Sequence, residues 1–400
     1  AELARGGMGI VYHGRDPLLA RDLAVKVLHE AHAGSEELRW RFRNEARLMA
    51  RLQHPGIVPV YDVAEFPDGR PCFTMRLVRG RGLSDLLAER GSPAEGLPHF
   101  TKVFEQVCQA MAYAHHQRII HRDLKPGNVL VAPFGVVKVM DWGVAKDLGD
   151  PSEPPAAQEG GVLPAPGRTE SGRILGTPAC MAPEQARAEP GVDERADVFG
   201  LGAILCVILT GQPPYGAEEG AVAYRRAVCG DVSSALAALA ACPAERELKD
   251  LARCCLSPRA ADRPRHAGEV ARAVVAYMES DLRRAERDLA RFFDLSLDLF
   301  CLAGLDGFFR RLNPNFSRVL GHSDEELLRR PFMDFVHPDD QEATRAAMGQ
   351  LSQGLAVVRF RNRYRDARGG WRCFEWTAKA VPEGGVVFAV ARDVTATAGP

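Results

Sequence analysis

A short polar stretch, residues 121–128, lies between two runs of isoleucine, valine and leucine. It reads His-Arg-Asp-Leu-Lys-Pro-Gly-Asn, and a polar stretch between apolar anchors predicts a fixed loop. Asp141 comes eighteen residues after Asp123, in Asp-Trp-Gly at the end of a strand-like run. Asn128 and Asp141 offer the hard oxygen ligands that Mg²⁺ prefers. Asp123 is then left to orient and deprotonate a hydroxyl group.

The helix predicted for residues 35–52 carries a carboxylate on its apolar side. Its apolar side chains recur at alternating steps of four and three residues, and Glu45 lies on the same stripe as Leu38, Phe42, Met49 and Leu52. Burial of an unpaired carboxylate costs several kcal/mol. We therefore expect a cation from the neighbouring sheet to pair with Glu45.

The elements that must position these residues change in type at about residue 80. Before it, short β-like runs alternate with the one helix, which predicts a small, sheet-rich lobe. From about 100 to 242 the periodicity is mainly helical, and residues 198–209 are apolar on all sides, as expected for a helix at the centre of a larger lobe. Residues 147–176 are rich in proline and glycine and predict a mobile loop.

A heptad pattern follows between residues 271 and 292. Its seam consists of Ala271, Val275, Met278, Leu282, Ala285, Leu289 and Phe292. Three heptads are the lower limit for predicting a coiled coil. Two interpretations stay open: a coiled coil, or a last domain helix followed by an amphipathic connector.

After residue 300 the pattern changes to hairpins and short helices. Asp306-Gly307 predicts a hairpin turn, and three strands are predicted at 357–365, 371–381 and 386–394. In the middle strand apolar and polar side chains alternate, as in a half-buried antiparallel strand.

Composition excludes several classes of protein. Four hundred residues predict two or three domains. A net charge of −1 gives no bulk electrostatic reason to expect nucleic acid as a partner. The longest apolar run has twelve residues, well short of the roughly twenty that a membrane span needs. Ten cysteines without a Cys-x-x-Cys predict reduced thiols and a cytoplasmic, intracellular location. Because the chain opens at Ala1 within a predicted element, we interpret it as a fragment.

Residues 1 to about 275 resemble a protein kinase domain of the serine/threonine type, similar to the bacterial eukaryotic-like (Hanks-type) kinases. The resemblance implies a bilobal α+β fold with a β-rich N-lobe, 1–78, and an α-rich C-lobe, 79–275. It also implies the roles of the polar residues: Lys26 binds phosphate and pairs with Glu45, Asp123 is the catalytic base, Lys125 steadies the transferring phosphate, and Asn128 and Asp141 hold the metal. By the same resemblance Glu184 of Ala-Pro-Glu pairs with Arg263, and Asp197 braces the catalytic loop.

The resemblance also implies ATP and Mg²⁺ as cofactors, with Mn²⁺ as an alternative metal. The implied nucleotide contacts are Gly6 and Gly9 over the phosphates, Val11, Ala24 and Leu130 around adenine, Met75 at the back of the pocket, and Lys26. Three positions depart from the family pattern: Ala4 replaces a glycine, Trp142 a phenylalanine and Cys180 a tyrosine. None of the three removes a charged or ligating group.

Two hydroxyls in the proline-rich segment, Thr169 and Ser171, are candidate regulatory sites. Phosphorylation there places about −2 of charge within reach of Arg122, which would order the segment. We therefore expect autophosphorylation at one of the two. The alternative is a linker whose hydroxyls have no role.

Residues 293–396 resemble an α/β PAS domain, which commonly dimerises and signals through a flanking helix. The sequence identifies no PAS ligand. Neither Cys301 nor Cys373 has the setting of a flavin-adduct photosensor, and we interpret His322 and His337 as loop or cap residues rather than haem ligands.

The sequence therefore predicts a kinase domain at 1–275, a helical linker at 276–292 and a PAS domain at 293–396. The expected function is ATP-dependent phosphorylation of serine and threonine in protein substrates. The expected assembly is a homodimer through the linker and the PAS domain, without nucleic acid or a membrane span. Two alternatives are a pseudokinase that serves as a nucleotide-binding scaffold, and a protein in which the PAS domain is the principal functional part.

Overall fold

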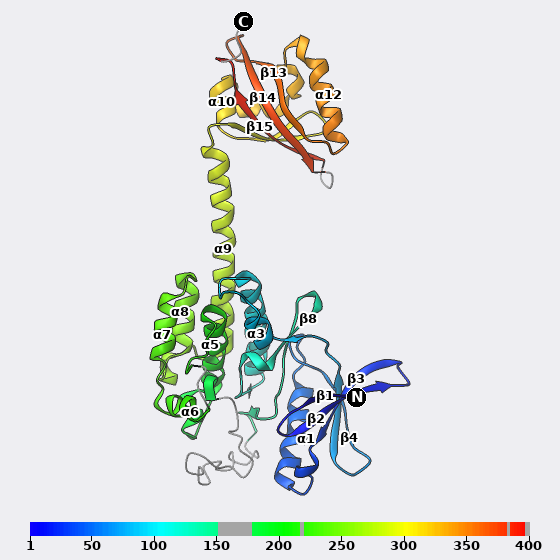
Figure 1. Ribbon diagram of the computed structural model, residues 1–400, viewed down its shortest axis with the longest axis vertical. Coiled ribbons are helices and arrows are strands. Elements are labelled where there is room, and N and C mark those ends of the chain that lie inside the picture. Colours follow the sequence, from blue (N-terminus) through cyan, green and yellow to red (C-terminus); the bar gives the residue numbers. More distant parts are fainter. Residues whose placement is uncertain (151–177, 217–219, 382–384, 397–400) are drawn as a thin grey trace. The chain divides into compact units, whose positions relative to one another are not determined.

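The chain folds into two compact units, Ala1–Glu279 and Ser280–Pro400, each with its own apolar core (Figure 1). Helix α9, Ala267–Leu295, contains the boundary between them. Within the described residues, no helix combines the length and the hydrophobicity of a membrane span. The computed structural model describes all residues except 151–177, 217–219, 382–384 and 397–400.

The first unit begins with a five-stranded antiparallel sheet in the order β1-β2-β3-β5-β4. Helix α1, Glu36–Arg51, packs against it, with the rings of Phe42 and Phe73 5.2 Å apart. Ser35 caps α1 by accepting a hydrogen bond from the Leu38 amide. The strands are β1 Glu2–Arg5, β2 Gly9–Asp16, β3 Arg21–Leu28, β4 Val60–Glu65 and β5 Pro71–Arg76.

The rest of the first unit is mainly helical, and α5, Glu194–Thr210, is its buried centre, in contact with α3 and α8 (Figure 1). Two glycines allow neighbours to approach α5 closely: a Cβ atom on Gly200 would lie 2.6 Å from Cβ of Leu124, and one on Gly202 would lie 2.7 Å from Cβ of Cys255. The other helices are α2 Leu83–Ala88, α3 Leu97–His116, α4 Pro183–Ala186, α6 Gly220–Cys229, α7 Ser233–Ala241 and α8 Arg246–Cys255.

Two small sheets position the polar stretch found in the sequence. One has the order β6-β8-β9 and the other pairs β7 with β10. The polar loop leaves β7 and enters β8, so both of its ends are fixed by strand pairing, as the apolar anchors predict. The strands are β6 Arg81–Gly82, β7 Ile119–Ile120, β8 Val129–Ala132, β9 Val136–Val139 and β10 Lys146–Asp147.

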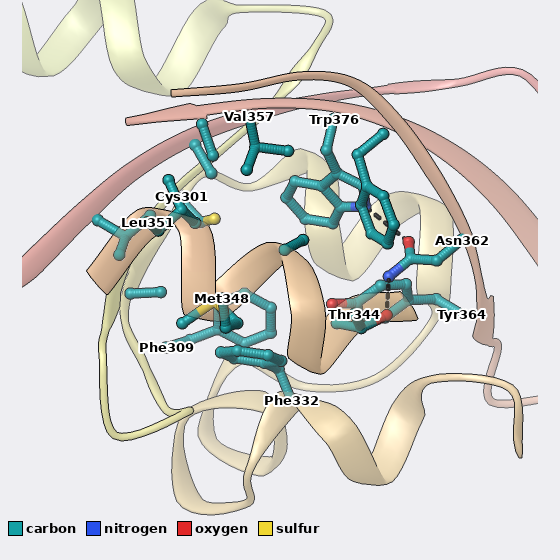
Figure 2. A pocket seen from close by; sticks show the side chains of 16 residues that line it. Cys301, Phe309, Phe332, Thr344, Met348, Leu351, Val357, Asn362, Tyr364 and Trp376 are labelled. Atoms are coloured by element: carbon teal, nitrogen blue, oxygen red, sulfur yellow. Dashed lines mark hydrogen bonds between the residues drawn. The ribbon is translucent and has the colours of Figure 1, made fainter. Parts of the chain in front are cut away.

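The second unit has a five-stranded antiparallel sheet in the order β12-β11-β15-β14-β13, and α12 packs against β13 and β14 (Figure 2). In β14, Phe374, Trp376 and Ala378 are buried, whereas Thr377 and Lys379 are exposed, so the predicted alternation is present. The strands are β11 Leu299–Gly304, β12 Phe309–Leu312, β13 Val357–Arg365, β14 Trp371–Val381 and β15 Val386–Asp393, and the helices are α10 Asn315–Leu320, α11 Asp324–Arg329 and α12 Gln341–Ser352.

Candidate active site

A buried ion pair joins the N-terminal sheet to α1. Nζ of Lys26, on β3, lies 2.5 Å from Oε1 of Glu45, on α1, and the two side chains are 13% and 2% exposed. Burial acts to lower the pKa of Lys26, but the carboxylates of Glu45 and Asp141 outweigh it and hold that pKa above its usual value. Lys26 therefore remains an ammonium group, paired with Glu45 and attracted by the charge of Asp141.

Asp123 is held from two sides on the loop between β7 and β8. Its Oδ2 accepts hydrogen bonds from Nζ of Lys125 at 2.8 Å and from Nδ2 of Asn128 at 3.0 Å. Nδ2 of Asn128 also donates to the Asp123 carbonyl at 2.8 Å. These bonds fix the direction of the Asp123 carboxylate, as a group that must receive a proton from a positioned hydroxyl requires.

Asp197, near the start of α5, holds the backbone of the same loop by hydrogen bonds. Its Oδ2 accepts from the amide of His121 and its Oδ1 from the amide of Arg122, both at 2.7 Å. Burial acts to raise the pKa of Asp197, but its hydrogen bond with His115 and the other donors hold it below its usual value. Arg122 has a positive φ of 67°, an uncommon conformation for a residue with a side chain, and these bonds hold the loop in it.

His115 links Asp197 to α9. Nε2 of His115, on α3, lies 2.9 Å from Oδ2 of Asp197, and Nδ1 of His115 accepts from the amide of Ala267, the first residue of α9, at 3.1 Å. Because Nδ1 accepts, the proton of the neutral ring is on Nε2, directed at Asp197. Nothing in the local sequence pattern pointed to His115.

Gly143 packs against three groups that the sequence did not place together. A Cβ atom there would lie 3.2 Å from Cε of Met8, 3.4 Å from Oδ1 of Asp141 and 3.4 Å from Oε2 of Glu45. A side chain at this position would therefore crowd both carboxylates. The third residue of Asp-Trp-Gly is the sequence signal for this position.

The tryptophan that stands in place of phenylalanine in Asp-Trp-Gly is accommodated in the core. Trp142 is fully buried, packs edge-on against His121 with ring centroids 4.7 Å apart, and donates from Nε1 to the Val139 carbonyl at 3.3 Å. Its added N–H group is thus satisfied. Cys180 is also buried, and burial raises the pKa of its thiol to about 12.

The Ala182-Pro183-Glu184 segment is anchored by a bidentate ion pair. Nη1 and Nη2 of Arg263 donate to the two carboxylate oxygens of Glu184 at 2.7 and 2.9 Å. The adjacent Gln185 donates to the Arg122 carbonyl at 2.7 Å, which ties this segment to the loop that carries Asp123. The predicted regulatory residues of the preceding segment, Thr169 and Ser171, lie outside the described residues.

The predicted nucleotide-binding residues lie on several strands. Gly6 and Gly9 form the turn between β1 and β2, where the Gly6 amide donates to the Gly9 carbonyl at 2.9 Å. In the sheet register Val11 is paired with Lys26, and Ala24 with Met75. Ala24 and Met75 are buried, and Leu130 lies on the separate strand β8.

The oxygen atoms expected to hold a metal are available. Asp141 is exposed, has a positive φ of 59°, and within the described chain no donor contacts its carboxylate. Asn128 uses only its Nδ2 within the loop, which leaves Oδ1. One amide oxygen and one carboxylate, completed by phosphate and water oxygens, suit Mg²⁺. The donor set therefore fits the metal that the sequence implied.

The loop 121–128 braced by Asp197, the buried pair of Lys26 and Glu45, and the ion pair of Arg263 with Glu184 together indicate the class of protein. The family described as "Protein kinase domain" matches residues 1–274, and the family described as "PAS fold" matches residues 309–391. The chain belongs to the protein kinase family and carries a PAS fold in its second unit. The predicted fold class is therefore confirmed.

Three relatives are similar to the first unit. "Serine/threonine-protein kinase PknB" of Mycolicibacterium smegmatis is 40% identical over 229 residues, covering 56% of this chain and 34% of the relative. "DNA damage-responsive serine/threonine-protein kinase RqkA" of Deinococcus radiodurans is 39% identical over 227 residues, covering 56% and 31%. "Serine/threonine-protein kinase PknL" of Mycobacterium tuberculosis is 36% identical over 266 residues, covering 66% and 61%. The chain thus matches about a third of the length of the first two.

Proposed function

We propose that this protein is a protein serine/threonine kinase, which transfers the γ-phosphate of ATP to serine and threonine hydroxyls of protein substrates. The observation that carries the proposal is the Asp123 carboxylate, which Lys125 and Asn128 hold in one direction on a loop braced by Asp197. The names of the relatives support the choice of serine and threonine.

In the proposed reaction the substrate hydroxyl oxygen attacks the γ-phosphorus atom, and Asp123 accepts the hydroxyl proton. The bond between the γ-phosphorus and the bridging oxygen breaks, and ADP leaves with the electron pair. Lys125, 2.8 Å from Asp123, lies where its charge stabilises the transferring phosphoryl group. The protein therefore contributes position and charge rather than a covalent intermediate.

We assign nucleotide binding to the five-stranded N-terminal sheet. Lys26, oriented by Glu45, would contact the phosphates, and the backbone of Gly6 and Gly9 would cover them. Asn128 and Asp141 would hold Mg²⁺, or Mn²⁺ in its place. The metal, when bound, neutralises charge on the phosphate oxygens.

Transfer of labelled phosphate to a protein substrate tests the proposal. We expect Asp123→Asn to lower the rate by about 10² to 10⁴, because the general base is lost. Asp250→Asn, a matched change at an exposed aspartate of α8, should leave the rate unchanged. A wild-type protein that binds nucleotide but transfers no phosphate would instead support the pseudokinase alternative.

We further propose that the second unit is a sensory and dimerisation module that regulates the kinase. The proposed location of the protein is intracellular. Exposed apolar side chains on α9 favour pairing with a second copy: Leu282, Leu289 and Phe292 are 61%, 71% and 66% exposed.

From the sequence we also propose that the protein phosphorylates itself at Thr169 or Ser171. Mass spectrometry after incubation with Mg-ATP should find phosphate on one of them. An active protein with neither residue modified would contradict it.

A further inference from the structure

The turn between β1 and β2, residues 6–8, is fastened to the segment that connects β3 to α1. Nε2 of His32 lies 3.1 Å from the Gly7 carbonyl oxygen, and the His29 amide donates to the Met8 carbonyl at 3.0 Å. His32 is the last residue of a single 3-10 turn in this connecting segment. Two neighbouring carbonyls of the turn are therefore held by donors from one segment of the chain.

The acceptor fixes the direction of the His32 hydrogen bond. A backbone carbonyl can only accept, so Nε2 of His32 carries a proton and donates it to Gly7. The neutral ring with its proton on Nε2 supplies this donor, and so does the charged imidazolium. The bond therefore persists across the pH range in which a histidine titrates.

The held carbonyl orients an amide that the turn leaves unbonded. The carbonyl of Gly7 and the N–H of Met8 belong to one planar trans peptide unit, so they point in opposite directions. Among the residues that the structure describes, neither the Gly7 amide nor the Met8 amide has a hydrogen-bond acceptor. His32 therefore directs the Met8 N–H away from residues 29–32 and leaves it available to an anion.

Packing alone does not hold this turn. A Cβ atom on Gly7 would meet no described atom within 4 Å, and one on Gly6 would meet only the Gly9 carbonyl oxygen, at 3.8 Å. Glycine also permits many backbone conformations. The hydrogen bonds from residues 29–32 therefore supply an order that neither packing nor the local sequence provides.

The same turn lies beside the candidate active site. A Cβ atom on Gly143 would lie 3.2 Å from Cε of Met8 and 3.4 Å from Oδ1 of Asp141, so the Met8 side chain and this carboxylate approach the same point. A backbone N–H in this place attracts phosphate oxygens, whereas a carbonyl oxygen repels them. The orientation of the Gly7–Met8 peptide unit therefore matters for nucleotide binding.

We propose that His32 is a positioning residue for the nucleotide phosphates, because its bond to the Gly7 carbonyl keeps the Met8 amide directed toward them. This inference rests on the nucleotide binding proposed above and adds a residue to it. His32 acts through the turn and does not touch the phosphates, since its Nε2 is already bonded to Gly7.

Calorimetric titration of the whole 400-residue chain with Mg-ADP and with adenosine tests the proposal. His32→Leu removes the donor, so we expect the affinity for Mg-ADP to fall by about 2- to 10-fold, as for the loss of one hydrogen bond. The affinity for adenosine should not change, because adenosine has no phosphate. His32→Gln places an amide N–H where Nε2 was and should bind Mg-ADP like the wild type.

Two further variants complete the comparison. His32→Asn carries the same amide on a side chain that ends short of Gly7, so it should resemble His32→Leu. If His32→Leu does not fold, the asparagine and glutamine variants alone decide between the outcomes. His116→Leu makes the same change at an exposed position of α3 and should leave the binding of both ligands unaltered.

Three results would overturn the positioning role. They are unchanged Mg-ADP binding in the leucine and asparagine variants, equal losses of Mg-ADP and adenosine binding, and a glutamine variant as weak as the asparagine variant. A merely structural role for His32 predicts the second result, because a damaged fold weakens both ligands alike. A wild-type chain that binds no Mg-ADP would also overturn it.

The titration needs no phosphoryl transfer, so the two proposals fail separately. An inactive protein whose affinity for Mg-ADP depends on His32 contradicts only the proposed enzymatic function. An active kinase whose affinity for Mg-ADP is independent of His32 contradicts only the positioning role.

Discussion

At the scale of single residues, the buried pair of Lys26 and Glu45 sets the chemistry of the N-terminal sheet. Burying two charges rarely adds net stability, because desolvation offsets the attraction between them. Oε2 of Glu45 is buried and, among the described residues, has no hydrogen-bond partner, which adds to this cost. The retention of such a pair is therefore better explained by the position that it gives the Lys26 ammonium group than by stability.

Removal of one partner should separate the two effects. Lys26→Met leaves Glu45 as an unpaired buried carboxylate, so we expect the free energy of unfolding to fall by about 3–5 kcal/mol and phosphate transfer to be lost. The double variant Lys26→Met/Glu45→Leu should recover most of the stability and none of the activity. Urea unfolding measures the stability of each variant, and a phosphate-transfer assay measures its activity. A double variant as unstable as the single one would contradict this account.

The thiol of Cys180 should be unreactive although it lies beside the catalytic loop. Cys180 and Asp123 line the same small hollow, of about 10 Å³. Since burial raises the pKa of Cys180 to about 12, its thiolate fraction at pH 8 is on the order of 10⁻⁴. Iodoacetamide at pH 8 should modify the exposed Cys229 and Cys254 and spare Cys180, as read by peptide mass spectrometry. Early modification of Cys180 in folded protein would refute this.

At the scale of elements, the sequence predicts best where the pattern is local. The strands 357–365 and 371–381 were predicted to the residue, because alternation and flanking glycines mark both ends. The burial of Glu45 also follows from a local stripe on α1. His115 and Gly143 could not be found in this way. The contact of His115 with Ala267 joins residues 152 positions apart, and two of the groups that crowd Gly143, Met8 and Glu45, come from distant segments.

The backbone N–H of Ala267, the first residue of α9, is therefore connected to the catalytic loop through His115 and Asp197. Ala267→Pro removes that donor while keeping a residue that suits the first position of a helix. The buried Nδ1 of His115 then loses its partner, so we expect stability to fall by about 1–3 kcal/mol and kcat to fall with little change in the KM for ATP. Arg246→Pro, at the first position of α8, is the matched control and should leave kcat unchanged.

The histidine itself provides a second test of the same connection. His115→Gln offers an oxygen to the Ala267 amide and an N–H to Asp197, so it should retain most of the activity. His115→Leu offers neither and should behave like Ala267→Pro or worse. Equal kcat values for the glutamine and leucine variants would show that the connection does not position the loop.

At the scale of the whole molecule, one helix belongs to both units. Of the seam positions, Ala271 is buried in the first core and Met278 packs against it, whereas Leu282, Leu289 and Phe292 are exposed. The same heptad pattern thus changes from an intramolecular contact to an unpaired apolar stripe. This division accommodates both interpretations of the sequence, because the helix ends the kinase domain and then continues as an apolar seam.

The unpaired stripe predicts the assembly state. Leu282→Asp/Leu289→Asp places two charges where a second copy would pack, so we expect a dimer of the wild-type chain to become a monomer and its rate of phosphate transfer to change. Arg287→Asp introduces the same side chain off the seam at an exposed position and should leave the dimer intact. Light scattering at matched concentrations gives the mass, and the transfer assay is run on the same samples. A double variant that keeps the wild-type mass and rate would remove α9 from the dimer interface, and with it the reason to expect pairing to regulate the kinase.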